Sequence, residues 1–325
     1  MKKVLVTGGA GYIGSHMVAA LLEAGHRVTV LDDLSTGHRE QVPAAASFAL
    51  GDVANARELL VRERFDGVIH FAAKIRVEES VANPRLYFHA NTMKSLALLD
   101  AMIDAKEAGA PLPSIVFSST AAVYGTPESV PIDEDHPKRP ESPYGSSKLA
   151  IEHALDAYGK AYGLRWAALR YFNAAGAHPE AGLGERHEPE THLIPIVLEV
   201  AAGERKHLTM FGTDWDTPDG TCVRDYIHVR DLAAAHLAAI EHLGRGGASG
   251  AFNCGTGKGT SVREIVRAVE RVTGKTVTVV ESPRRAGDPA VLVAKVDRAA
   301  EVLGWRAERT DLDAIVSDAW AFKMR

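Results

Sequence analysis

Tyr144 and Lys148 are two residues whose chemistry and spacing could support proton transfer. If the residues from 143 onward form a helix, this four-residue spacing places both side chains on one face, about one turn apart. A lysine ammonium near a tyrosine hydroxyl favours the phenolate, which can act as a base at neutral pH. The pair alone also fits a core aromatic beside a solvated lysine, so the surrounding elements must decide between these interpretations.

Three hydroxyl residues, Ser118, Ser119 and Thr120, follow a strand predicted at residues 114–118. In chains that alternate strands and helices, ligands bind at the carboxyl ends of the parallel strands, where these residues would lie. A hydroxyl group there can bond both to a substrate oxygen and to the Tyr144 phenol. The three hydroxyl residues are therefore candidates to share a site with Tyr144.

A glycine-rich turn joins the predicted strand at residues 4–6 to a helical pattern, which is the context of a dinucleotide site. Gly8 allows a tight turn, Gly11 lets the backbone approach a pyrophosphate, and Gly14 permits close packing of helix on strand. The helix N-terminus favours the negative charge of the phosphates. The spacing is Gly-x-x-Gly-x-x-Gly rather than Gly-x-Gly-x-x-Gly, and a purely structural turn is the alternative.

Two aspartates that follow strands are further candidates to contact a nucleotide. The strand predicted at 27–31 ends at Asp32, whose carboxylate can bind an adenosine ribose. Its charge would repel a 2′-phosphate, so NAD is favoured over NADP. Asp52 follows the strand predicted at 47–50, and either hydrogen-bonds an adenine amino group or caps a helix near Asn55.

The alternation of strands and helices predicts an α/β protein with a Rossmann-type doubly wound parallel sheet. We expect an NAD-binding Rossmann domain over residues 1–173 and a smaller C-terminal α/β substrate domain over residues 174–325. Residues near 225–245 are candidates to pack back on the first domain. The strand signals of the first part lie at residues 4–6, 27–31, 47–50, 67–71, 114–118 and 165–169.

Three other segments complete the organisation of the first part. Phe71–Ala73 ends a strand with small residues that let a cofactor pass closely over the sheet. Asn91 lies in a helix beginning near Pro84, where its amide either faces solvent or contacts the site. Residues 127–143 are rich in proline and charge and are predicted to form a surface excursion before the Tyr144 helix.

Composition argues against several classes of protein. The formal net charge of −5 over 325 residues disfavours a general binder of nucleic acid or anionic membranes. No apolar run approaches the ~18 residues of a membrane span, so we expect a cytoplasmic protein. Cys222 and Cys254 form no paired metal or redox motif. His178, His187 and His192 lie in irregular loop sequence without metal-ligand spacing, so no metal site is predicted.

Several motifs, in this order, resemble those of the nucleotide-sugar epimerases in the extended short-chain dehydrogenase/reductase family. The resemblance runs from Lys3 to about Trp305, and its later motifs are the more specific ones. The motifs are Thr7-Gly8-Gly9-Ala10-Gly11-Tyr12-Ile13-Gly14-Ser15-His16, Ser118-Ser119-Thr120 with Val123-Tyr124-Gly125, Tyr144 with Lys148, Arg170-Tyr171-Phe172-Asn173, Val223-Arg224-Asp225-Tyr226-Ile227-His228 and Arg285-x-Gly287-Asp288.

The resemblance implies a tightly held NAD that is reduced and reoxidised within one turnover, with UDP-glucose and UDP-galactose as the interconverted pair. Tyr144 would take the proton of the sugar 4-hydroxyl while hydride leaves C4, and Thr120 would position that hydroxyl. Lys148 would lower the pKa of Tyr144 and hold the nicotinamide ribose. The 4-keto sugar would turn over while its UDP group stays bound. A homodimer joined through helices of the first domain is also implied.

The same resemblance assigns binding residues along the chain. Those toward NAD are Gly8, Gly11, Tyr12, Ile13, Gly14, Asp32, Asp33, Asp52, Val53, Phe71, Ala72, Ala73, Asn91, Ser118, Tyr144, Lys148, Tyr171 and Phe172. Those toward the UDP-sugar are Thr120, Tyr144, Asn173, His192, Leu193, Phe211, Arg224, Arg285, Asp288 and Leu292.

Three positions depart from the pattern of the family. Ile75 stands where relatives commonly have a cofactor-contacting lysine, and Lys74 beside it is a candidate replacement. His192 replaces an asparagine. Leu292 stands where a bulkier residue, often tyrosine, limits the sugar pocket, so we expect some room for UDP-N-acetylglucosamine or UDP-N-acetylgalactosamine.

Three alternative functions are compatible with parts of this pattern. A nucleotide-sugar 4,6-dehydratase needs an acid/base pair directly after the threonine, where this chain has Ala121 and Ala122, which cannot transfer protons. A reductase that releases NADH would use the same Tyr144 and Lys148. An NAD-sensing regulatory protein would keep Asp32 and the glycine turn but would not need the proton-transfer residues.

Overall fold

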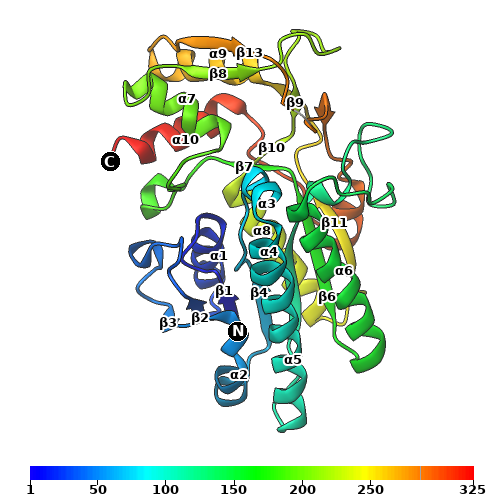
Figure 1. Cartoon of the computed structure of the whole chain (residues 1–325). Helices are drawn as coiled ribbons and strands as arrows, with labels where there is room; N and C mark the ends of the chain where they lie inside the picture. Colours follow the sequence, from blue (N-terminus) through cyan, green and yellow to red (C-terminus); the bar gives the residue numbers. More distant parts are fainter. Residues whose placement is uncertain (286) are drawn as a thin grey trace.

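The computed structural model describes residues 1–285 and 287–325, and it centres on a seven-stranded sheet in which every neighbouring pair is parallel (Figure 1). The strand order is β11–β6–β5–β4–β1–β2–β3, so the chain winds outward in both directions from β1 and β4. This confirms the doubly wound Rossmann-type sheet. The strands are β1 (Lys3–Thr7), β2 (Arg27–Asp32), β3 (Ser47–Leu50), β4 (Gly67–His70), β5 (Ser114–Thr120), β6 (Trp166–Tyr171) and β11 (Gly250–Cys254).

Helices cover both faces of this sheet because alternate side chains of each strand point to opposite faces. Val4 and Val6 of β1 pack in one core cluster with α1 (Tyr12–Glu23) and α8 (Val229–Gly244). Leu5 points the other way, into a cluster formed with α2 (Arg57–Glu63), α5 (Lys94–Glu107) and α6 (Pro143–Tyr162). The short helices α3 (Val77–Ala82) and α4 (Pro84–Tyr87) precede a π-helical turn at Phe88–Met93.

The remaining part of the chain forms a smaller α/β unit, seen at the top of Figure 1. Its helices α7 (Leu193–Ala202), α9 (Val262–Thr273) and α10 (Leu312–Lys323) share one apolar core. Three small sheets pair β10 with β7, β9 with both β12 and β14, and β13 with β8. Their strands are β7 (Asn173–Ala175), β8 (Leu208–Phe211), β9 (Val223–Arg224), β10 (Tyr226–His228), β12 (Thr260–Ser261), β13 (Val279–Ser282) and β14 (Val291–Leu292).

Two segments that follow residue 173 contact the first part of the chain. α8, which lies within the residues near 225–245, packs against α1. β11 also returns to the large sheet, where Asn253 lies opposite Arg170 of β6, and this seventh strand was not predicted. We therefore propose that residues 229–254 belong with the first domain rather than with the second.

The segment over residues 127–143 is more than the surface excursion expected from its composition. Ile132, Glu134 and His136 are buried within it. The Ile132 N–H donates to the Val293 carbonyl at 2.9 Å, and the Lys295 N–H donates to the Ile132 carbonyl at 2.8 Å. The prediction was wrong for these residues because the segment pairs with a strand-like stretch far away in the sequence. Within residues 1–285 and 287–325, no helix has the length and hydrophobicity that a membrane crossing requires.

Candidate active site

The first turn of α6 places Tyr144 and Lys148 as their spacing predicts. Ser142 caps the helix by accepting the Gly145 N–H at 3.1 Å, and Pro143 occupies the first helical position, where no N–H is required. Tyr144 is 8% exposed and Lys148 is 3% exposed. The interpretation of the lysine as a solvated side chain is therefore wrong.

Thr120 ends β5, opposite Tyr171 of β6, and reaches the same site. Burial raises the pKa of Tyr144 above its ordinary value, and a hydrogen bond with Thr120 only partly offsets this effect. Ser118, two residues earlier, has its hydroxyl 2.6 Å from the Tyr171 hydroxyl. The hydroxyl-rich end of β5 thus meets α6 and β6, as expected for the carboxyl edge of the sheet.

Lys148 is directed at the strand rather than at the tyrosine. Its Nζ donates to the Ser118 carbonyl at 3.0 Å and lies 5.0 Å from the centre of the Phe117 ring. Burial lowers the pKa of Lys148 to about 7. The predicted lowering of the Tyr144 pKa by this ammonium is not met in this structure, because burial dominates the pKa of Tyr144 and Lys148 makes its contact elsewhere.

Asn91 is hydrogen-bonded to the first turn of α6. It is 1% exposed, so the alternative in which its amide faces solvent is wrong. Its side chain accepts the Lys74 N–H at 2.8 Å and donates to the Lys74 carbonyl at 3.0 Å and to the Ser147 hydroxyl at 3.1 Å. Ser147 in turn donates to the Tyr144 carbonyl at 2.7 Å. Asn91 therefore couples residue 74 to the first turn of α6, while Ile75 is exposed.

The glycine-rich turn forms a cradle that larger residues would fill. Gly8 has a φ of +72°, and a Cβ there would lie 2.5 Å from the Ala72 nitrogen. A Cβ on Gly14 would lie 2.1 Å from the Gly8 carbonyl oxygen. Bare backbone at the start of a helix fits the phosphates of a dinucleotide. The turn also lies against Phe71–Ala73, since the Phe71 N–H donates to the Thr7 carbonyl at 2.9 Å.

Asp32 ends β2 and is tied to this turn. Its carboxylate accepts the Ala10 N–H at 2.9 Å and the Leu34 N–H at 2.8 Å, and Asp33 beside it is exposed. Tyr12 donates its hydroxyl to the Gly176 carbonyl at 2.7 Å, and Ile13 packs against the core.

Asp52 caps the short helix Val53–Asn55, which is one of the two roles considered for it. Its carboxylate accepts the Ala54 N–H at 3.0 Å and pairs with Lys94 at 2.5 Å. Burial would raise the pKa of Asp52, but these hydrogen bonds and the Lys94 charge hold it below its usual range. The neighbouring Val53 is buried. A contact of Asp52 or Val53 with adenine stays a prediction.

Four of the predicted substrate residues of the second part lie together: Phe211, Arg224, Arg285 and Asp288. Arg285 donates to the Asp288 carboxylate at 3.0 Å, and Arg224 lies 3.8 Å from the same carboxylate. The Arg285 guanidinium stacks 4.8 Å from the centre of the Phe211 ring. Guanidinium groups beside an exposed aromatic ring suit a base and a diphosphate.

Leu292 and Asn173 connect this group to the catalytic residues. Leu292 is the register partner of Arg224 and packs with Phe172 against the cluster that contains Ala121 and Val123, next to Thr120. The Asn173 N–H donates to the Asp225 carbonyl at 3.0 Å, between β7 and β10. Two chain segments more than a hundred residues apart thus meet beside Thr120.

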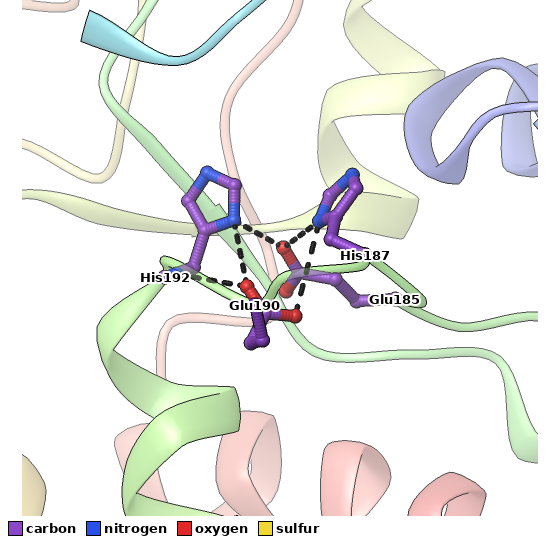
Figure 2. A group of neighbouring side chains, drawn as sticks. All are labelled: Glu185, His187, Glu190 and His192. Carbon is purple, nitrogen blue, oxygen red and sulfur yellow. Dashed lines mark hydrogen bonds and ion pairs between the residues drawn. The ribbon is translucent and has the colours of Figure 1, made fainter. Parts of the chain in front are cut away.

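His192 and Leu193 lie at the start of α7, and His192 belongs to a cluster that sequence analysis missed. Its ring and that of His187 converge on the carboxylates of Glu185 and Glu190 (Figure 2). Burial lowers the pKa of His192, but the two carboxylates outweigh it and raise that pKa to about 10. The spacing Glu-x-His-x-x-Glu-x-His resembles no common ligand motif, so only the loop fold reveals the group.

Comparison with known proteins shows the family of this chain. The family model described as "NAD dependent epimerase/dehydratase family" matches residues 4–255. A UDP-glucose 4-epimerase of Corynebacterium glutamicum is 52% identical over 98% of this chain and 95% of that protein.

Solved structures of the same class align over nearly the whole chain. The UDP-glucose 4-epimerase of Brucella ovis in complex with NAD is 47% identical, with a TM-score of 0.93 over 98% of each chain. That of Bifidobacterium longum in complex with NAD+ and UDP is 38% identical, with a TM-score of 0.90 over 99% of this chain and 98% of that one. With its own glycine turn and Tyr144–Lys148 helix in the expected places, this chain belongs to the NAD dependent epimerase/dehydratase family.

Proposed function

We propose that this protein interconverts UDP-glucose and UDP-galactose by transient oxidation at C4 of the sugar. The observation that carries the proposal is the burial of Thr120, Tyr144 and Lys148 together at the carboxyl edge of the sheet, the edge at which the glycine turn also lies. The similarity to UDP-glucose 4-epimerases over nearly the whole chain supports the choice of substrate.

The side chains divide the chemistry between them. Tyr144 accepts the proton of the 4-hydroxyl, and Thr120, hydrogen-bonded to the phenol, orients that hydroxyl. Bound in the glycine cradle, NAD supplies a hydride-accepting carbon and a positive charge that favours a phenolate. Arg224 and Arg285 hold the diphosphate while the 4-keto sugar rotates. Remote contacts therefore retain the intermediate without restraining the ring that must turn over.

The dehydratase alternative is not favoured. Ala121 and Ala122 form the short helical turn that follows Thr120, at the place where that reaction needs an acid and a base. Alanine side chains offer no proton-transfer group. Alanine at these two positions does not prevent epimerisation. Oxidation and reduction at C4 need one acid/base residue, which Tyr144 provides.

The first experiment incubates the purified protein with UDP-galactose, without added NAD, and follows the sugars by NMR. We expect UDP-glucose to form, with Tyr144→Phe reducing turnover at least ~100-fold, since general acid–base catalysis contributes about 10²–10⁴-fold. Tyr158→Phe is the matched control, because this tyrosine lies on the same helix but donates its hydroxyl to Asp100 at the surface. Normal turnover by a folded, NAD-containing Tyr144→Phe protein would remove Tyr144 as the base.

A broader substrate range is part of the proposal. Leu292 leaves more room than a tyrosine would, so we expect measurable turnover of UDP-N-acetylglucosamine. Failure to detect that reaction at high enzyme concentration would restrict the pocket to the smaller sugars.

We further propose a homodimer that works in the galactose metabolism of the cytoplasm. Exposed apolar side chains on adjacent short helices support a contact surface there: Val77, Val81, Phe88 and Met93. Light scattering of the purified protein should give twice the mass of the chain. Charged substitutions at Val81 and Met93 should yield monomers, whereas a monomeric wild type would contradict the proposal.

A further inference from the structure

Four side chains of the loop between β7 and α7 converge on one point (Figure 2). One ligand atom from each of Glu185, His187, Glu190 and His192 lies within 4.8 Å of all the others. The His187 Nδ1 is 3.1 Å from Glu185 and 3.8 Å from Glu190. The His192 Nδ1 is 2.7 Å from Glu185 and 3.2 Å from Glu190.

The arrangement also has the geometry of a coordination shell. Each imidazole nitrogen faces both carboxylates, although one N–H can donate well to only one of them. Ligands at ~2.0–2.1 Å from a tetrahedral ion lie about 3.3 Å from one another. The four nitrogen–oxygen distances, from 2.7 to 3.8 Å, lie on both sides of that separation.

The two carboxylates of the cluster also require positive charge beside them. The Glu185 and Glu190 side chains are each only 7% exposed. Among the described residues, neither has a lysine or arginine within ion-pair distance, since the neighbouring Arg186 pairs with Glu40. Two buried carboxylates must be neutralised, either by two imidazolium groups or by one divalent ion bound to neutral imidazoles.

The Glu190 carboxylate is held in place before any ion binds. It accepts the backbone N–H groups of Thr191 at 2.7 Å and of His192 at 2.8 Å. Such outer hydrogen bonds orient a ligand and reduce the entropy lost on coordination.

We propose that Glu185, His187, Glu190 and His192 bind one zinc-like divalent cation in a closed, four-coordinate structural site. Two imidazoles with two carboxylates suit Zn²⁺ or Co²⁺, whereas Mg²⁺ and Ca²⁺ prefer oxygen ligands alone. Because protein atoms supply all four ligands, no open position is left for catalysis.

The ion would brace the loop between the two binding regions. Tyr12 of the glycine turn packs edge-on against His187, with ring centres 6.4 Å apart, and its hydroxyl donates to the Gly176 carbonyl at the start of the loop. At the other end, His192 directly precedes Leu193 and α7. This bracing role rests on the proposed function, whereas the metal site itself does not.

The test measures metal content and needs no substrate. The holoenzyme is stripped with a chelator, dialysed against buffered Zn²⁺ and analysed by atomic absorption. We expect one Zn²⁺ per chain in the wild type. In Glu185→Gln/His187→Asn the affinity should fall at least ~100-fold, beyond the 10–100-fold typical of losing an outer-shell partner. The matched control is Glu188→Gln/His178→Asn, which changes the same residue types outside the cluster and should keep the ion.

A second measurement keeps the proposal testable if the cluster variant fails to fold. Wild-type protein loaded with Co²⁺ should show the intense visible absorption of a tetrahedral site. Absence of both bound Zn²⁺ and this absorption would overturn the proposal and leave an ion-paired cluster. Retention of Zn²⁺ by a folded cluster variant would overturn it as well, because the ion would then be bound elsewhere. Neither result depends on epimerase turnover, so failure here is separate from failure of the proposed function.

Discussion

Loss of the buried Glu152 carboxylate should be among the most damaging single changes in this protein. Glu152 of α6 accepts two hydrogen bonds from Arg170 of β6, at 2.5 and 3.0 Å, and a third from the Ser119 hydroxyl at 2.6 Å. The two charged side chains are only 4% and 6% exposed. The pair therefore joins the catalytic helix to the two strands that carry Thr120 and Tyr171.

The cost of Glu152→Gln follows from the charge that is left behind. Removing one partner of a buried ion pair typically costs about 3–5 kcal/mol, because the other charge stays buried without compensation. Total stabilities are ~5–15 kcal/mol, so the variant should lose a large fraction of its stability. The control Asp104→Asn breaks a pair with Arg57 whose side chains are 57% and 52% exposed, and should cost about 0–1 kcal/mol.

Urea unfolding of both variants and of the wild type, each saturated with NAD, measures the difference. Glu152→Gln/Arg170→Met should lose less than the sum of its single variants, because the double change removes the unpaired charge. A stability loss for Glu152→Gln no larger than that of Asp104→Asn would refute this reasoning. Such a result would mean that water or a rearrangement of the structure compensates the buried charge of Arg170.

Two further predictions concern the catalytic lysine and the glycine turn. The pKa of Lys148 is about 7 in the folded protein, below the ~10.4 of an unfolded lysine, so the unfolded chain binds more protons between these values and wild-type stability rises with pH. Lys148→Met should therefore be more stable than the wild type near neutral pH, and this advantage should shrink by about 1.4 kcal/mol per pH unit toward pH ~10. Urea unfolding of the NAD-free proteins measures it, and a difference independent of pH would show that Lys148 keeps its ordinary pKa. Gly14→Ala should lose NAD during gel filtration, because its Cβ would meet the Gly8 carbonyl oxygen at 2.1 Å, whereas Gly51→Ala meets only a Leu31 methyl group at 3.4 Å and should keep it. Equal NAD content in both variants would contradict the cradle.

Local sequence was sufficient for the elements that carry the chemistry. Each strand predicted in the first part is present, because buried parallel strands appear as short apolar runs bounded by turn residues. The Tyr144 helix is marked by Ser142 and Pro143, and the glycine turn by its position between strand and helix. These features depend on neighbours within a few residues, so pattern and spacing determine them.

Contacts between distant segments were decided only by the tertiary structure. β11 is short and joins the sheet by pairing with β6, and the residues next to it in the sequence do not predict this pairing. The Asn91 amide is buried and donates to the Ser147 hydroxyl, and the Lys148 ammonium donates to the Ser118 carbonyl. Burial and the available partners set these side-chain directions. The cluster of Glu185, His187, Glu190 and His192 likewise depends on how its loop folds. The sequence by itself determined which reactive groups exist and which elements hold them. Packing decided where those side chains point and which charged groups lie next to them. Both properties depend on burial and on residues far away in the chain.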